Sequence, residues 1–223
     1  MGLRDRSGGG GDLAPAGLKT PRAAGVAGLL FAALFTASIL ITRSVAYPTT
    51  TGFYADVARL VGDNVSIVSA YLVPFAGIAF LWFIGVVRDR IGVYEDRFFS
   101  TVFLGSGVVF VALLFSAAAV LAALQLLTRP TDATTELARL IGRAMFYMYG
   151  ARAAGVFTLV TSTIALRTDA TPKWAAFVGF AVGLVLLLTV QSFDLVILLF
   201  PAWVALVSVL MLVKAPPREA ARD

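Results

Sequence analysis

Long apolar runs separated by short polar segments dominate this chain. Four runs, at about 23–42, 65–87, 98–127 and 142–166, each hold 20 to 30 residues with few charges. About 20 helical residues, at ~1.5 Å each, cross the ~30 Å hydrocarbon core of a bilayer. Each of these runs is therefore expected to form one membrane-spanning helix.

The last apolar run is longer than the others. Residues 174–213 give forty positions with a single charge, Asp194. One helix of that length would measure about 60 Å, which corresponds to two crossings. The polar cluster at Gln191–Asp194 marks the turn, so spans at about 174–191 and 195–213 are expected. The chain is therefore predicted to be an all-α polytopic integral membrane protein, a bundle of six transmembrane helices without a large soluble domain.

The polar segments at the ends and between the runs add detail. Residues 1–22 are rich in Gly, Pro and charge and predict a disordered tail, and 214–223 form a second polar tail. Between the first two runs, Phe53, Val57 and Leu60 recur at helical spacing. Two interpretations stay open for them: an amphipathic helix in the membrane interface, or a solvated turn of helix.

Two runs have informative residues at their starts. The first is preceded by Lys19 and Arg22, as a secretory signal peptide would be. A typical signal-peptide core has about 7–15 residues and this run is longer, which favours a retained helix. Before the fourth run, Asp132, Thr134 or Thr135 is expected to cap the start of a helix.

The basic residues predict the orientation. Six spans put both termini on the same side of the membrane. Of the 18 Lys and Arg, about 12 fall on the side of the termini, 5 fall on the other side, and Arg152 lies within a span. Because cytoplasmic connections carry the excess of Lys and Arg, both termini are expected in the cytoplasm.

Composition supports a membrane protein and excludes several chemistries. The mean hydropathy is +0.89, and only 14% of the residues are charged, against about 25% in soluble domains. The net charge of +5 is not arranged as a basic stripe with interleaved aromatic residues, so nucleic acid is not an expected partner. The chain has no Cys and no His, which removes thiolate and imidazole ligands and the usual catalytic bases. No cofactor, metal site or catalytic residue is predicted.

Arg152 has the most unusual position, near the middle of the fourth run. An arginine at that depth costs roughly 2.5–3.5 kcal/mol on insertion scales. Three interpretations stay open. The guanidinium binds an anionic ligand on a face that includes Tyr149, snorkels toward the outer surface, or pairs with Asp194, Asp132 or Glu136 and locks the bundle. Asp194 is itself also expected to cap the sixth helix.

Small residues and prolines within the spans predict how the helices pack. Glycine lets helices approach closely in lipid, where packing drives association. Helix packing is predicted at these glycines of spans three to five: Gly105, Gly107, Gly150, Gly155, Gly179 and Gly183. Proline removes a backbone donor, so Pro74 and Pro201 are expected to kink spans two and six.

Two resemblances can be named. The residues Gly85, Asp89, Arg90 and Gly92 resemble the G-x-x-x-D-R-x-G loop signature of the major facilitator superfamily, although a charged tight turn would have the same residues. The match covers about eight residues, and six spans are only half of that fold.

The second resemblance is broader. The runs 72–85, 95–99, 103–107 and 161–168 resemble a widespread group of uncharacterised bacterial multi-pass membrane proteins. This resemblance implies a bacterial plasma membrane and a single six-helix unit, and it carries no activity or site residue.

The favoured function is a non-enzymatic accessory or interaction protein of the plasma membrane. Its small-residue helix faces would bind a protein partner or a second copy of the chain within the lipid bilayer. The alternative is a small-solute transporter or lipid-binding protein with an intramembrane site at Arg152.

Overall fold

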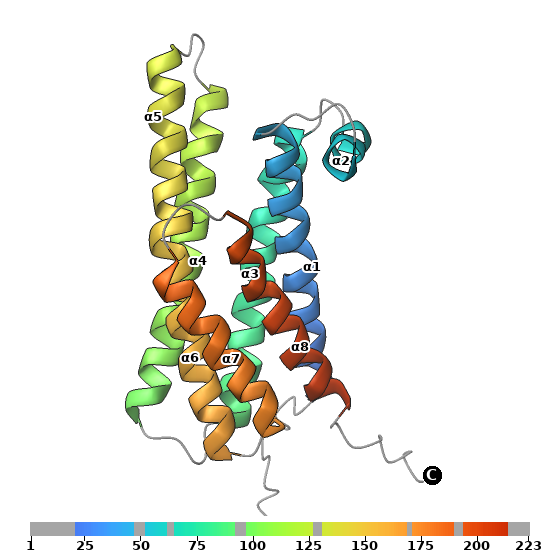
Figure 1. The fold of residues 1–223 in the computed structure, drawn as a ribbon, viewed down its shortest axis with the longest axis vertical. Coiled ribbons are helices and arrows are strands. Elements are labelled where there is room, and N and C mark those ends of the chain that lie inside the picture. Colours follow the sequence, from blue (N-terminus) through green and yellow to red (C-terminus); the bar gives the residue numbers. More distant parts are fainter. Residues whose placement is uncertain are drawn as a thin grey trace, which may run out of the picture.

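The structure, a computed structural model, is built from helices (Figure 1). It describes residues 21–46, 52–61, 65–91, 97–126, 131–168, 171–189 and 194–213. Apart from positions 21 and 22, the two predicted tails lie outside these residues. Within the described ranges no strand occurs, which confirms the all-α prediction.

The helices follow one another with short connections. In chain order they are α1 (Pro21–Ala46), α2 (Phe53–Val61), α3 (Val65–Ile91), α4 (Arg97–Leu126), α5 (Asp132–Arg143), η2 (Ala144–Gly150), α6 (Ala151–Thr168), α7 (Lys173–Leu188), η3 (Asp194–Leu198) and α8 (Leu199–Val213). Segment η2 is a π-helix and η3 is a 3₁₀-helix, whereas the others are α-helices.

Four stretches of the described helices are long and apolar enough to cross a membrane. They are Ala23–Ser44, Tyr71–Arg88, Phe98–Leu124 and Leu195–Val213. These stretches indicate a membrane protein. The predicted span at 142–166 falls on η2 and α6, where the π-helix interrupts the α-helical hydrogen bonding. Helix α7 is apolar but has only 16 residues, or about 24 Å.

The start of α1 and the end of α8 lie together. A Cβ on Gly25 would come 2.9 Å from the carbonyl oxygen of Ser208 and 2.7 Å from Cδ2 of Leu212. Both ends therefore lie at the lower end of the bundle in Figure 1.

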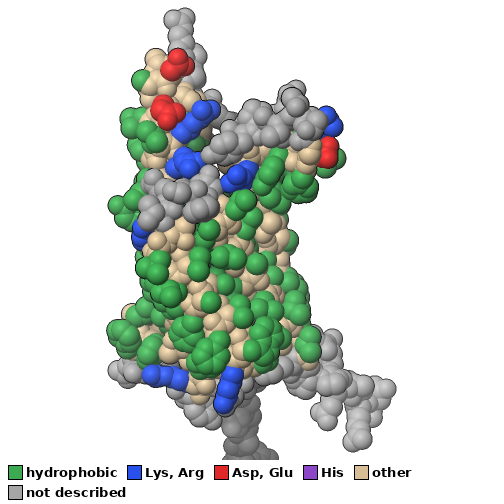
Figure 2. Space-filling model, viewed as in Figure 1, with side chains coloured by type: hydrophobic (Ala, Val, Ile, Leu, Met, Phe, Trp, Pro, Cys, Tyr) green, Lys and Arg blue, Asp and Glu red, His purple; other side chains and the backbone are tan. Residues whose placement is uncertain are grey.

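Side-chain types are layered along the bundle. On the face shown in Figure 2, hydrophobic side chains cover the middle, and Lys and Arg gather toward the two ends. Acidic side chains also lie at the upper end, on α5 and α2, close to basic side chains. This layering fits an apolar band flanked by two interfaces.

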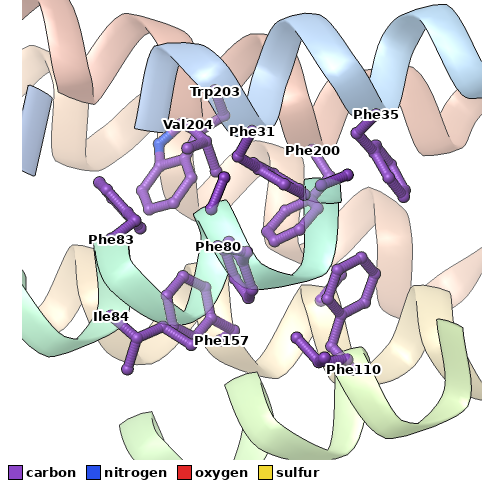
Figure 3. Close-up of a cluster of buried hydrophobic side chains, with 14 of the residues drawn as sticks. Phe31, Phe35, Phe80, Phe83, Ile84, Phe110, Phe157, Phe200, Trp203 and Val204 are labelled. Atoms are coloured by element: carbon purple, nitrogen blue, oxygen red, sulfur yellow. The ribbon is translucent and has the colours of Figure 1, made fainter. Parts of the chain in front are cut away.

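Phenylalanine rings from several helices form the centre of the bundle (Figure 3). Phe80 of α3 is fully buried and lies at the middle of the cluster. Its ring centroid lies 4.6 Å from that of Phe31, 5.0 Å from Phe157, 5.3 Å from Phe110 and 5.5 Å from Phe200. These rings come from α1, α6, α4 and α8, so one side chain joins five helices.

The N-cap of helix α5 is a residue other than the three that were expected. Its N-cap is Thr131, whose side chain accepts a hydrogen bond from the Thr134 backbone N–H, 3.2 Å away. The Thr134 hydroxyl in turn accepts from the Thr131 N–H at 3.0 Å. This reciprocal capping box needs two hydroxyl residues three positions apart, so Thr134 serves as its second member and Asp132 opens the helix.

Helix α2 fulfils the expectation of a helix between the first two runs. It follows Gly52, whose φ of 93° lies in the left-handed region that favours glycine. Phe53 and Leu60 are exposed on it, and Arg59 pairs with Asp56 at 3.3 Å across one turn. Its location in a membrane interface stays a prediction.

Candidate functional site

The helix from Asp132 to Thr168 is continuous but changes its hydrogen bonding midway. At its end, η2 is closed by a bond from the Ala151 N–H to the Phe146 carbonyl, five residues earlier. A π-turn of this kind is rare and is found frequently at functional sites. It directly precedes Arg152, so the π-turn and the predicted site residue lie together.

Arg152 lies half-buried at the junction of η2 and α6. Its Nη1 donates a hydrogen bond to the Met148 carbonyl oxygen, one turn earlier. The side chain therefore points back along the helix toward α5, as helical side chains generally do. Among the described residues, no acid forms an ion pair with it.

Tyr149 and Asp194 are the two predicted neighbours of Arg152. Tyr149 is 60% exposed on the surface of η2. Asp194 opens η3, but its side chain lies outside the described part, so its pairing with Arg152 stays a prediction. Gly155, three residues after Arg152, faces α7, whereas Tyr149, three residues before it, is exposed.

Helices α6 and α7 approach most closely at two glycines. A Cβ on Gly155 would lie 2.9 Å from the carbonyl oxygen of Gly183, and a Cβ on Gly183 would lie 3.0 Å from the carbonyl oxygen of Gly155. Backbone meets backbone here, so neither position has room for a side chain. Both glycines are among those at which the sequence predicts helix packing.

Gly179 lies where α6, α7 and α8 meet. A Cβ there would approach the Ser162 hydroxyl closely and would lie 2.6 Å from Nε1 of Trp203. Ser162 donates to the Thr158 carbonyl oxygen at 2.8 Å. Trp203 is only 3% exposed, and its Nε1 has no hydrogen-bond partner in the described part of the chain.

The other candidate glycines occupy different surroundings. The atoms nearest to a Cβ on Gly150 would be the Met145 carbonyl oxygen, at 3.3 Å, and the Phe146 ring, both within its own helix. Gly105 is exposed, with nothing within 4 Å, while a Cβ on Gly107 would meet Ile84 and Phe157.

Three tight glycine contacts were missed from the sequence. Gly25 and Gly28 of α1 pack against α8, where Gly28 faces Ser208, and Gly77 of α3 faces the Phe115 ring of α4. The Gly25-x-x-Gly28 spacing in the first apolar run was the available signal for the first two. A single glycine such as Gly77 carries no such signal.

The two prolines lie in different local settings. Pro74 is inside α3 and is exposed. Pro201 is buried in the first turn of α8, directly after η3. The kinks expected at Pro74 and Pro201 stay predictions.

Three arginines near the ends of the apolar band lie over aromatic rings. The Arg167 guanidinium lies 4.4 Å from the ring centroid of Phe99, that of Arg143 lies 5.4 Å from Tyr147, and that of Arg43 lies 5.8 Å from Tyr54. Such cation–π contacts keep a charged head at the surface while the stem packs on apolar neighbours.

The comparisons with known proteins add no relative. No family model matches the chain, and neither a curated protein nor a solved structure matches it. The two resemblances drawn from short runs of residues therefore stay predictions.

Proposed function

We propose that the protein is a non-enzymatic accessory or interaction protein of the plasma membrane, with six spans and both termini in the cytoplasm. The observation that carries the proposal is a contrast between interior and surface. The centre of the bundle is filled by phenylalanine, while a row of small residues on α4 stays exposed. The absence of Cys and His from the sequence supports a function other than catalysis.

The six-span topology draws support from helix lengths. Segments η2 and α6 together hold 25 residues, or about 37 Å, which exceeds the ~30 Å core. Segments η3 and α8 hold 20 residues. The 16 residues of α7 are short for a crossing and imply local thinning of the bilayer.

A test of this topology uses the absence of native cysteine. Single cysteines placed at Glu136 and at Lys173 are expected to react with a membrane-impermeant maleimide from opposite sides of sealed vesicles or intact cells. Glu136 should be labelled from outside, and Lys173 only after permeabilisation. Labelling of both positions from the same side would exclude the proposed path of the chain between α5 and α7.

Small residues form the centre of the exposed face of α4, and the exposed Val108 and Val109 lie beside them. Of the four candidate spans, α4 has the smallest share of buried residues in its apolar stretch, 28%, compared with 50% in α1. The positions at the centre of this face recur at intervals of three, four or seven: Gly105, Ala112, Ser116, Ala119 and Ala123. Small residues at such spacing let a second helix approach closely in lipid.

Ser116 gives this face a polar group. Its hydroxyl forms no hydrogen bond with the described residues, whereas Ser106 on the same helix donates to the Val102 carbonyl oxygen at 2.7 Å. A free hydroxyl at a small-residue face is available to bond across to another helix. We propose that a second copy of the chain covers it, because a face at one edge of the bundle can pair with itself about a two-fold axis.

Disulfide crosslinking in native membranes tests this pairing. Ser116→Cys is expected to form a disulfide-linked dimer under mild oxidation, and Ala181→Cys on the exposed face of α7 serves as the matched control. Crosslinking of the control alone, or of neither variant, would reject a second copy on α4. A heterologous partner would then be the remaining form of the interaction proposal.

The transporter alternative has less support. A solute path needs polar groups or water through the middle of the bundle, and this level is occupied by the rings around Phe80. The buried hydroxyls of Thr158, Thr161 and Ser162 donate to carbonyl oxygens of their own helix. These groups are satisfied locally and offer a solute little.

A further inference from the structure

The guanidinium of Arg152 has unused hydrogen-bonding capacity. It carries five N–H donors, of which Nη1 donates one hydrogen bond to the Met148 carbonyl oxygen. Within the part of the chain that the structure describes, the other donors have no acceptor. In a membrane, donors of a charged group must meet water or a lipid oxygen, because the hydrocarbon provides neither.

The depth of Arg152 follows from the helix that carries it, given the proposed topology. Arg167 is exposed near the lower end of α6 and lies over Phe99, near the start of α4. If that level is one edge of the ~30 Å core, the other edge lies about 20 residues back, near position 147. The bond to Met148 holds the guanidinium nearer to this edge than its own Cα. The charge thus lies where lipid ester and phosphate oxygens begin.

We propose that Arg152 binds the phosphate of an anionic lipid in the outer leaflet, an assignment that rests on the proposed topology. The planar guanidinium can donate to two phosphate oxygens at once, and the bond to Met148 holds it in place before the lipid arrives. Tyr149, exposed at nearly the same depth, supplies the amphipathic ring typical of a membrane interface.

The π-turn lies directly before this site. Tyr149 near its end is exposed, whereas Gly155 on α6 faces α7. One side of the helix is thus exposed while another packs on the bundle. Arg152 lies between these two positions in the chain and is half-buried. A long arginine side chain in such a position can pack its stem while its head reaches the surface.

The test measures lipid retention by the full-length chain in dodecyl maltoside, using native mass spectrometry. Titration with phosphatidylglycerol and, separately, phosphatidylcholine is expected to show preferential retention of phosphatidylglycerol by the wild type. Arg152→Gln should weaken phosphatidylglycerol binding about tenfold, the loss expected for one charge-assisted contact. Arg139→Gln serves as the matched control, because Arg139 is an exposed arginine on the same continuous helix but lies beyond the apolar band.

Several outcomes would overturn the proposal. These are equal retention of both lipids by the wild type, unchanged binding by Arg152→Gln, or an equal loss in the Arg139→Gln control. Displacement of the lipid by equimolar inorganic phosphate would show that free phosphate, and not a lipid, is the ligand.

If Arg152→Gln fails to fold, Arg152→Lys tests the same contact, since it keeps the charge and the apolar stem. It is expected to bind phosphatidylglycerol more weakly than wild type, and unchanged affinity would contradict two-oxygen binding. The crosslinking on α4 uses other residues, so either proposal can fail alone.

Discussion

Replacing Phe80 with alanine is expected to lower the thermal stability of the purified protein more than any other single truncation of the core. The ring contacts partners from four other helices, and its removal leaves a cavity among them. Buried Phe→Ala changes cost roughly 3–5 kcal/mol. We expect a cost at the low end of this range. In a membrane, lipid solvates the apolar side chain in the unfolded state, so the substitution removes mainly packing contacts. At about 3 kcal/mol, the melting temperature should fall by roughly 6–12 °C.

The matched control for Phe80→Ala lies on the same helix. Phe75 has the same side chain but is 56% exposed on the outer face of α3. Phe75→Ala should change stability by no more than about 0.5 kcal/mol, as surface substitutions usually do. Fluorescence-detected unfolding in one detergent measures both variants. Equal losses for the two would contradict a core organised around Phe80.

Gly155→Ala is expected to disrupt the contact between α6 and α7. The added methyl would lie 2.9 Å from the Gly183 carbonyl oxygen and 3.0 Å from Cγ of Leu187, so a backbone segment would have to move. Overpacking of this kind costs typically about 1–3 kcal/mol. The melting temperature and the monodisperse fraction after size exclusion are the measurements.

Gly105→Ala is the control for that substitution. It introduces the same methyl group into a helix of the same protein, at a position where nothing lies within 4 Å. Alanine favours helix over glycine by about 1 kcal/mol, so this variant should be neutral or slightly stabilised. Because Gly105 also lies on the exposed face of α4, crosslinking through Ser116 in the Gly105→Ala background shows whether the face tolerates added bulk.

The sequence was most informative about where helices run. The apolar runs at 65–87 and 98–127 fall on α3 and α4. Of the predicted turn at Gln191–Asp194, only Asp194, at the start of η3, lies within the described residues. Hydropathy locates these segments because lipid demands that nearly every residue in a span be apolar. The same property hides which face is inside. Phe75 and Phe80 are the same residue in one apolar run, and only tertiary packing separates their roles.

The local geometry around Arg152 could not be read from the sequence. The run at 144–150 has no proline or glycine pair to signal a break, and its residues are compatible with an ordinary α-helix. The π-turn shifts the phase of everything after it, so faces assigned at a period of 3.6 residues fail across it. The N-cap of α5 was missed for a related reason. Thr131, Asp132 and Thr134 are all good caps, and the reciprocal bonds between two threonines decide among them.

The unequal lengths of the helices have a consequence for the surrounding lipid. Helix α4 has 30 residues and would span about 45 Å, whereas α7 has 16 and spans about 24 Å. In the proposed topology, in which α7 crosses the bilayer, lipid chains beside α7 would be compressed while those beside α4 could extend fully. The protein would then carry a gradient of membrane thickness around its circumference. Shorter-chain lipids should collect at the α7 side, and neighbouring proteins with short spans should meet the least resistance there.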